Sequence, residues 1–285
     1  MKLNKNQKIL IVGLGLIGGS YAEGLTKAGY YVGAIALEQE TIDYALEKGI
    51  IASGLAEVKE EYVKQFDVII FALYPHVFIE WMEKYQIYLK SNAVITDVTG
   101  VKRAVVYKIQ EMLRDDIEFV GAHPMAGKET SGVKNASSEI FKKANYIVTP
   151  TDKNTEENIE LVRSIGETLG FKNIVTLSPE EHDEMIGFLS QLTHCIAVSL
   201  MTCKESEHLA LYTGDSFRDL TRIAKINEEM WPELFLLNKD ELISQMNLFI
   251  KECEKLRDYI KEDDTGHIQD MMRLSTERRK HFDKD

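Results

Sequence analysis

His123 is the residue of this chain best suited to general base chemistry. It follows a short apolar run that begins at Phe119, precedes Pro124, and is followed by a glycine-rich loop that ends at Gly132. Imidazole titrates near neutral pH, and ligands of open α/β sheets bind at the carboxyl ends of strands. A histidine before proline is also a common packed turn residue. The position alone therefore leaves both interpretations open.

A glycine motif near the N-terminus indicates a second kind of chemistry. The motif spans Gly13–Gly18 and directly follows the apolar run Ile9–Val12. Its first glycine permits a tight turn, its second lets a pyrophosphate approach the backbone, and its third lets a helix pack on the strand. The N-terminus of that helix offers unpaired N–H groups to phosphates. The motif therefore predicts a nicotinamide dinucleotide site.

Strand-like runs alternate with helical stretches through the first 178 residues. Strands alternating with helices of this length are typical of a parallel sheet with right-handed crossovers. We therefore expect an α/β Rossmann domain with one mostly parallel sheet, which the last two strands extend. The predicted strands are Ile9–Val12, Tyr31–Ala36, Asp67–Leu73, Ala93–Asp97, Glu118–Gly121, Asn145–Thr149 and Asn173–Leu177.

Four loops follow these strands and should meet at one edge of the sheet. They are the glycine motif, Tyr74–Pro75, Asp97–Lys102 and His123–Gly132. Carboxyl ends of parallel strands share an edge, so this convergence favours a functional role for His123. The residues expected to contact the cofactor are Gly13, Leu14, Gly15, Leu16, Ile17, Gly18, Glu38, Leu73, Tyr74, Pro75, Asp97 and Thr99.

The pattern changes after Ser178, where no further strand-like run appears. Glu180–Lys204 and Asn238–Lys261 are predicted to be long helices, with a final helix near His267–His281. Apolar residues in the second of these helices recur alternately four and three apart, a spacing typical of bundle packing or of a dimer interface. We expect a Rossmann domain at residues 1–178 and an all-α domain at residues 179–285 that forms a homodimer through its helices.

Composition limits the partners and the compartment. The 285 residues include 34 Lys and Arg against 46 Asp and Glu, a formal charge of -12. Nucleic acid and anionic membranes are therefore not expected as partners, and an anionic ligand must be held by local cations. Cys195, Cys203 and Cys253 show no paired or metal-ligand spacing. This favours free thiols in a reducing cytoplasm and no metal site.

The N-terminal apolar run resembles a signal peptide, but its glycines have the spacing of a nucleotide loop. The longest other apolar run, Val68–Tyr74, is far shorter than the roughly 18–20 residues that cross a bilayer. We therefore expect no secretion and no membrane span.

Five motifs together resemble the prephenate dehydrogenase family of tyrosine biosynthesis. They are Val12–Ser20, Thr96–Lys102, Gly121–Gly132, Gln191–His194 and Phe217–Arg222, and they extend over essentially the whole chain. The resemblance implies a Rossmann domain followed by a helical dimerisation domain, with the active site between them. It also implies NAD-dependent oxidative decarboxylation of prephenate, a small anion, to 4-hydroxyphenylpyruvate.

The resemblance also implies roles for single residues. His123 would accept the proton of the C4 hydroxyl while hydride leaves C4 for the nicotinamide. Arg222 would bind a substrate carboxylate and His194 would help to hold the substrate, although a surface cation and a packed core histidine are the alternatives. Arg218 either contacts substrate, or it pairs with Asp219 or holds the domain junction. Thr99 and Lys102 would belong to the catalytic residues, and Lys128 and Glu129 to the substrate-binding residues.

This chain departs from the family pattern at three places. Thr99 and Gly100 stand where relatives commonly have Gly-Ser or Ala-Ser, so the hydroxyl that helps to hold the substrate oxygen comes from Thr99 or is missing. Lys128 replaces a small hydroxyl residue. Gln191 and Thr193 stand where His and Pro are common.

Three other functions remain open from the sequence. Arogenate differs from prephenate only by an amino group in place of a keto group on the side chain, so an arogenate dehydrogenase is the first. Other dehydrogenases with a Rossmann and a helical domain are the second, although these commonly use a catalytic lysine in the helical domain. A nucleotide sensor that binds NAD without turnover is the third.

The nicotinamide preference depends on Glu38. The end of the second predicted strand holds Ala36, where NAD sites usually have an acid, and Glu38 follows two residues later. Glu38 either reaches the ribose or is solvated at the start of the next helix. Tyr30–Ile42 contains no Lys, Arg or His but contains Glu38 and Glu40. A 2′-phosphate would therefore meet like charge, at a cost of about 1 kcal/mol or more.

We predict a modest preference for NAD over NADP that decreases in Glu38→Gln. The measurement is kcat/KM with each nicotinamide for both proteins. A wild-type preference for NADP, or an unchanged ratio in the variant, would contradict this assignment.

Overall fold

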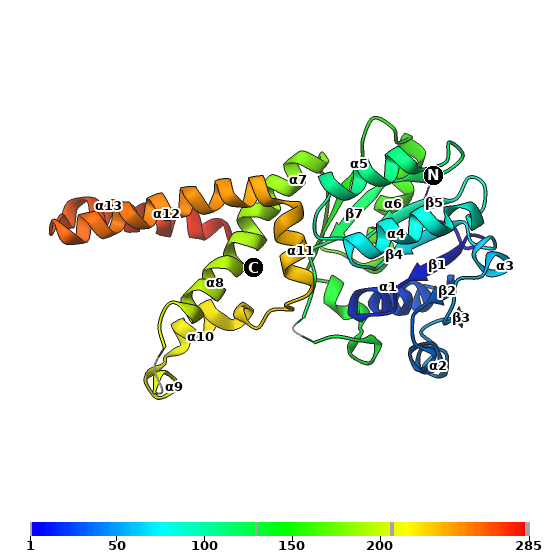
Figure 1. Ribbon diagram of the computed structural model, residues 1–285, viewed down its shortest axis with the longest axis horizontal. Helices are drawn as coiled ribbons and strands as arrows, with labels where there is room; N and C mark the ends of the chain where they lie inside the picture. The colour runs from blue at the N-terminus through cyan, green and yellow to red at the C-terminus, as the bar shows by residue number, and fades with distance from the viewer. Residues whose placement is uncertain (1, 129, 206–207, 283–285) are drawn as a thin grey trace. The chain divides into compact units, whose positions relative to one another are not determined.

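The computed structural model describes residues 2–128, 130–205 and 208–282. The chain divides into two compact units, residues 1–238 and residues 239–285. The first unit contains both sheets and the helices through Leu237, and the second contains the remaining helices (Figure 1). The predicted domain division at residue 178 stays a prediction.

The main sheet has six parallel strands in the order β3-β2-β1-β4-β5-β6. This order confirms the Rossmann architecture expected from the alternating pattern. The sequence prediction lacked β3 and the short helix α3. The strands are β1 (Lys8–Val12), β2 (Tyr31–Ile35), β3 (Ser53–Leu55), β4 (Val68–Phe71), β5 (Val94–Asp97) and β6 (Glu118–Phe119), and the helices between them are α1 (Leu16–Lys27), α2 (Gln39–Glu47), α3 (Glu60–Val63), α4 (Pro75–Tyr85), η1 (Gln86–Tyr88) and α5 (Arg103–Met112).

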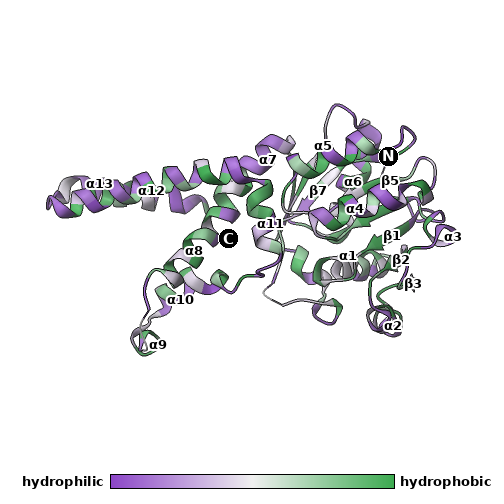
Figure 2. Cartoon of the chain, viewed as in Figure 1, coloured by the Kyte–Doolittle hydropathy of each residue, from purple (hydrophilic) through white to green (hydrophobic). Residues whose placement is uncertain are grey.

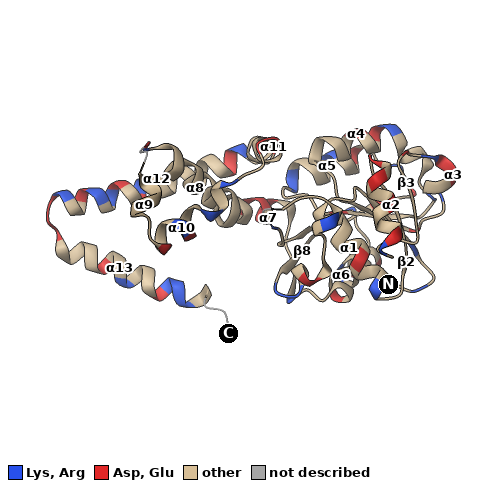
Figure 3. Ribbon diagram, turned by 90° about the horizontal axis from the view of Figure 1, so that it is seen from below, with Lys and Arg blue, Asp and Glu red and all other residues tan. Residues whose placement is uncertain are grey.

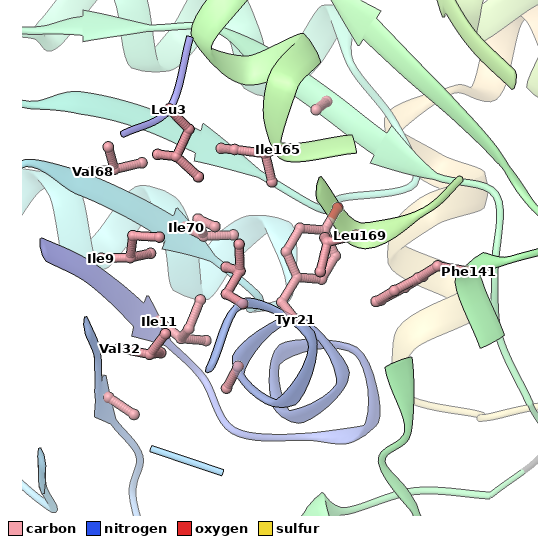
Figure 4. Packing of buried hydrophobic residues seen from close by; sticks show 14 of the residues in the cluster. Leu3, Ile9, Ile11, Tyr21, Val32, Val68, Ile70, Phe141, Ile165 and Leu169 are labelled. Atoms are coloured by element: carbon pink, nitrogen blue, oxygen red, sulfur yellow. The ribbon is translucent and has the colours of Figure 1, made fainter. Parts of the chain in front are cut away.

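Both faces of this sheet are covered by apolar side chains. On one face, Tyr21 of α1 packs edge-on against Phe141, with ring centroids 5.1 Å apart, above the sheet residues labelled in Figure 4. On the other face, Phe71 stacks on Phe78 of α4 at 4.3 Å. Burial of one such side chain contributes about 1.5–3 kcal/mol. Burial on both faces explains why the strands are continuously apolar rather than alternating.

A second sheet of three strands carries His123. It consists of β7 (Gly121–Pro124), β8 (Asn145–Thr149) and β9 (Asn173–Thr176). Strand β7 is antiparallel to β8, and β8 is parallel to β9 with helix α6 (Glu156–Leu169) between them. The prediction that these strands extend the first sheet is therefore wrong.

The chain leaves the first sheet at Val120. The Val120 amide donates to the Ile95 carbonyl at 2.9 Å, and from Gly121 onward the partner strand is β8. A Cβ on Gly121 would lie 2.5 Å from Thr149 Oγ1, so only glycine allows this close approach. His123 consequently lies within an antiparallel strand, opposite Ile147, and not beyond the end of a parallel strand as predicted.

The helical run after the sheets begins with a capping box. Ser178 and Glu181 exchange hydrogen bonds at the start of α7 (Pro179–Ile186). The π-helix η4 (Gly187–Leu192) joins α7 to α8 (Thr193–Thr202), so the predicted single helix contains a widened turn. Such turns are frequent at functional sites. The remaining elements between β7 and residue 238 are η2 (Val133–Asn135), η3 (Ser138–Phe141), α9 (Leu209–Tyr212), α10 (Asp215–Thr221), η5 (Arg222–Ala224) and α11 (Met230–Leu237).

The run Pro179–Thr202 is also the one membrane-span candidate among the described residues. Its most apolar window has a mean hydropathy of 1.4 and is 28% buried. The expectation that the chain has no apolar run of this length was wrong. The acidic residues of the run are confined to its first two turns, and the remainder is apolar enough to pass the test. Core helices of soluble proteins and signal sequences pass the same test, so length and hydropathy alone do not show a membrane span. Figure 2 colours most of α8, the second half of this run, as apolar.

The second unit contains helices α12 (Lys239–Lys261) and α13 (Thr265–Arg279) and the short η6 (Lys280–Phe282). The two long helices contact each other, and Asp264 caps α13 by accepting from the His267 amide at 3.1 Å. Both helices carry many charges of both signs (Figure 3). Phe249 and Ile260 belong to the apolar residues that recur four and three apart in α12, and both are exposed.

Candidate functional site

A buried ion pair fixes the loop after β5. Lys102 Nζ lies 2.7 Å from Asp97 Oδ2, and both side chains are 0% exposed. Asp97 also accepts from the amides of Thr99 and Ala122, each at 3.0 Å. Burial lowers the pKa of Lys102, and the adjacent Asp97 carboxylate opposes that shift. The pair ties the β5 loop to β7, the strand of His123.

His123 belongs to a line of three hydrogen-bonded side chains. His123 Nδ1 lies 2.9 Å from His182 Nε2, and His182 Nδ1 lies 2.8 Å from Asp183 Oδ1. Burial, together with His182 and Lys102, lowers the pKa of His123 well below its ordinary value. The His123 imidazole is therefore neutral at neutral pH, the state that a general base requires.

His182 and Asp183 were not among the predicted site residues. Both are fully buried on α7, and Asp183 accepts from the backbone amides of Lys102 at 2.8 Å and Arg103 at 2.9 Å. Asp183 therefore binds the N-terminus of α5, where a negative charge is favoured by the helix dipole. The sequence does place a histidine next to an aspartate, which could have indicated these two residues. The neighbouring acids Glu180, Glu181 and Glu184 are exposed, however, so the buried pair does not stand out in the sequence.

Gly100 lies beside the His123 ring. A Cβ built there would be 3.9 Å from His123 Cε1 and 3.5 Å from Leu234 Cδ1, which are ordinary contacts. The place where relatives commonly carry a serine is therefore next to the predicted base. The Thr99 hydroxyl lies within hydrogen-bond distance of the Asp97 carboxylate and, at 3.0 Å, of the Val101 carbonyl, and its single proton is donated to one of these acceptors. The hydrogen-bond partners of this hydroxyl therefore belong to the same loop as Thr99.

His194 and Arg222 form a second group. His194 Nδ1 lies 2.8 Å from the Ser190 carbonyl, and its ring lies against Trp231 at a centroid distance of 3.8 Å. Burial lowers the pKa of His194, the Ser190 carbonyl opposes this, and the Arg222 charge adds to the lowering. Arg222 therefore lies within electrostatic reach of His194.

Helix α11 contacts both groups. Its Leu234 lies beside Gly100 and so near His123, while its Trp231 packs on His194. Trp231 and Leu234 are three positions apart, which places them on one helical face. The two groups of predicted site residues are thus brought together around α11.

Three other predicted residues lie elsewhere or outside the description. Arg222 begins η5, and Arg218 lies on the preceding helix, α10. Its guanidinium pairs with Asp215 at 3.0 Å, rather than with Asp219. Lys128 is exposed in the loop after β7, and Glu129 lies outside the described residues.

The glycine motif fits a dinucleotide. Gly13 has φ +98°, and a Cβ on Gly18 would lie 1.9 Å from the Gly13 carbonyl oxygen, so both positions need glycine. A Cβ on Gly15, the N-cap of α1, would have no atom of the described residues within 4 Å. The backbone at Gly15 therefore faces the open space that a pyrophosphate requires at a helix N-terminus.

The other predicted cofactor residues differ in burial. Leu14 is buried in the core, whereas Leu16, Ile17, Leu73 and Tyr74 are half-buried. Pro75 begins α4, and the Tyr74 hydroxyl accepts from Asn227 Nδ2 at 3.2 Å. Glu38 is exposed at the N-cap of α2. Their contacts with a cofactor stay predictions.

Comparison with known proteins identifies the family. The nucleotide-binding domain of prephenate dehydrogenase matches residues 22–175, and its dimerization domain matches residues 178–274. The prephenate dehydrogenase of Bacillus subtilis is 33% identical over 271 residues, which cover 91% of this chain and 72% of that protein. This chain belongs to the prephenate dehydrogenase family.

Two further relatives extend the comparison. A crystal structure of A. aeolicus prephenate dehydrogenase in complex with hydroxyphenyl propionate and NAD+ superimposes with a TM-score of 0.89 at 30% identity, covering 99% of this chain and 100% of that one. The cyclohexadienyl dehydrogenase of Zymomonas mobilis is 27% identical, covering 95% and 94%. Membership confirms the fold class and the oxidoreductase activity, and the dimerization-domain match supports a homodimer.

Replacing Lys102 by Met should destabilise the protein. The change leaves the Asp97 carboxylate buried without its counter-ion, which typically costs about 3–5 kcal/mol. The measurement is the free energy of unfolding in urea. Lys64→Met, which removes an exposed ion pair with Glu61, is the control and should leave stability nearly unchanged. Equal effects of the two substitutions would contradict a structural role for the buried pair.

Proposed function

We propose that this protein is a prephenate dehydrogenase that converts prephenate to 4-hydroxyphenylpyruvate, with His123 as the base. The observation that carries the proposal is the position of the His123 imidazole, which is hydrogen-bonded through Nδ1 and lies beside Gly100 in a chain of this family. The open turn at Gly15 suits NAD, which is the cofactor.

In this proposal His123 accepts the proton of the substrate hydroxyl and later returns it. Bound NAD supplies the hydride acceptor. His123 Nε2 accepts the proton of the C4 hydroxyl while the C4–H bond releases hydride and C4 becomes a carbonyl carbon. The bond between the ring and its carboxylate then breaks, CO2 leaves, and the bonding electrons make the ring aromatic. The proton returns from His123 to the former hydroxyl oxygen, which gives the phenol and restores the base.

Arg222 and His194 are the groups we assign to the substrate side chain and its carboxylate. A guanidinium offers a planar pair of donors that matches a carboxylate. The chain carries a formal charge of -12, so a local cation is needed to hold an anion. The Trp231 ring against His194 fixes the direction of the imidazole.

Homodimer formation through the helical region and a cytoplasmic location complete the proposal. The dimerization-domain match and the exposed apolar residues Met201, Phe249 and Ile260 support the interface. The free thiols of the three cysteines suit a reducing compartment.

Assays with two substrates and two nicotinamides test the proposed function. We expect the highest kcat/KM with prephenate and NAD. The Zymomonas mobilis relative, a cyclohexadienyl dehydrogenase, is the reason to include arogenate. Higher kcat/KM with arogenate would reassign the substrate and leave the ring chemistry unchanged. NAD binding without reduction by either substrate would identify a sensor and refute the proposal.

His123→Asn should retain the fold and NAD binding but lower turnover by about 10²- to 10⁴-fold, the usual contribution of a positioned base. The measurements are kcat at saturating prephenate and the Kd for NAD. His281→Asn, on the exposed η6, is the matched control. Near wild-type turnover of His123→Asn would show that another group is the base.

A further inference from the structure

We propose that Asp183 and His182 are positioning residues that hold His123 in the tautomer whose proton is on Nδ1, so that Nε2 is free to accept the substrate proton. The proposal rests on the assignment of His123 as the base and extends it to two residues of α7. It follows from the direction in which each hydrogen bond of the line must run.

Asp183 sets the direction because its carboxylate only accepts hydrogen bonds. Its two oxygens receive the backbone amides of Lys102 and Arg103 at 2.8 and 2.9 Å. These amides begin α5, whose dipole favours the ionised carboxylate. The third partner, His182 Nδ1, lies 2.8 Å from Asp183 Oδ1. This nitrogen must carry a proton, because otherwise two lone pairs would face each other.

The same argument passes from His182 to His123. Neutral His182 with its proton on Nδ1 has only a lone pair on Nε2. That lone pair lies 2.9 Å from His123 Nδ1, which must therefore be the donor. His182 and Asp183 are fully buried, so water does not compete for these bonds. The Asp183 carboxylate consequently determines the tautomer of His123 through His182.

The charges around this line also bear on proton transfer. His123 faces His182 from α7 and Lys102 from the β5 loop, and the ion-paired Asp97 partly offsets the Lys102 charge. Burial disfavours the imidazolium that forms when His123 accepts a proton. The imidazolium can still donate from Nδ1 to His182, and the negative Asp183 stabilises the positive charge through that bond.

A buried amide network holds Asp183 in place. Asn238 Nδ2 donates to the Asp183 carbonyl at 2.9 Å and to Gln191 Oε1 at 2.8 Å. Gln191 Nε2 in turn donates to the Leu234 carbonyl at 2.9 Å. Gln191 stands where relatives commonly have a histidine, so this chain fixes the position of Asp183 through an amide pair that connects α7 to α11.

Asp183→Asn is the first test. Its amide cannot accept from both backbone N–H groups and from His182 at once, and an Nδ2 group facing His182 favours the opposite tautomer in both histidines. We expect kcat to fall by about 10²- to 10⁴-fold, with KM for prephenate and Kd for NAD within about threefold of wild type. Loss of the negative charge should also move the acid limb of the kcat/KM profile to lower pH, because protonated His123 is then less stable.

The matched control is Asp264→Asn. Asp264 pairs with His267 Nδ1 at 2.6 Å on α13, so the same chemical change is made in an exposed His-Asp pair outside the site. Its activity and pH profile should be those of wild type. An Asp183→Asn variant with kcat within about threefold of wild type would overturn the proposal.

A second pair of variants decides the question if Asp183→Asn does not fold. His182→Gln keeps an acceptor for His123 Nδ1, whereas His182→Leu removes it. We expect the Gln variant to retain at least about tenfold more activity than the Leu variant. Equal activities of two folded variants would overturn the tautomer argument. If His123→Asn is inactive while these variants are normal, the base assignment survives and only the positioning role fails.

Discussion

Lys102 joins the parts of the structure that hold the predicted base. Its ammonium group pairs with Asp97 at the end of β5, and its backbone amide donates to Asp183 on α7. Asp97 in turn accepts from the Ala122 amide, one residue before His123. The side chain and backbone of one residue thus connect the parallel sheet, the second sheet and α7. His123 lies where these three elements meet.

Burying this much charge has a desolvation cost. Buried ion pairs often contribute no more than well-packed apolar side chains would, although removal of one partner is strongly destabilising. The gain here is positional, because each carboxylate is fixed by several N–H donors. Directional bonds of this kind hold a reacting group more rigidly than apolar packing does. The same burial keeps the pKa of His123 low and the imidazole neutral.

The sequence predicted those parts of the molecule that depend on local patterns. Apolar runs located most strands, and the glycine motif located a turn whose geometry fits a dinucleotide. The second sheet was not predictable, because β7 differs from a continuation of β6 only in a long-range pairing with β8. His182 and Asp183 were missed for a related reason. Their roles depend on partners about 60 and 80 residues away, to which no helical or strand spacing points.

The tautomer of His123 is the quantity on which the account depends most directly. It can be measured by NMR of the enzyme labelled with ¹⁵N at its histidine rings, using His123→Asn to assign the signal and working at a pH where the ring is neutral. The account predicts that Nδ1 of His123 carries the proton and that Nε2 does not. A protonated Nε2 with a bare Nδ1 in the wild-type enzyme would contradict it.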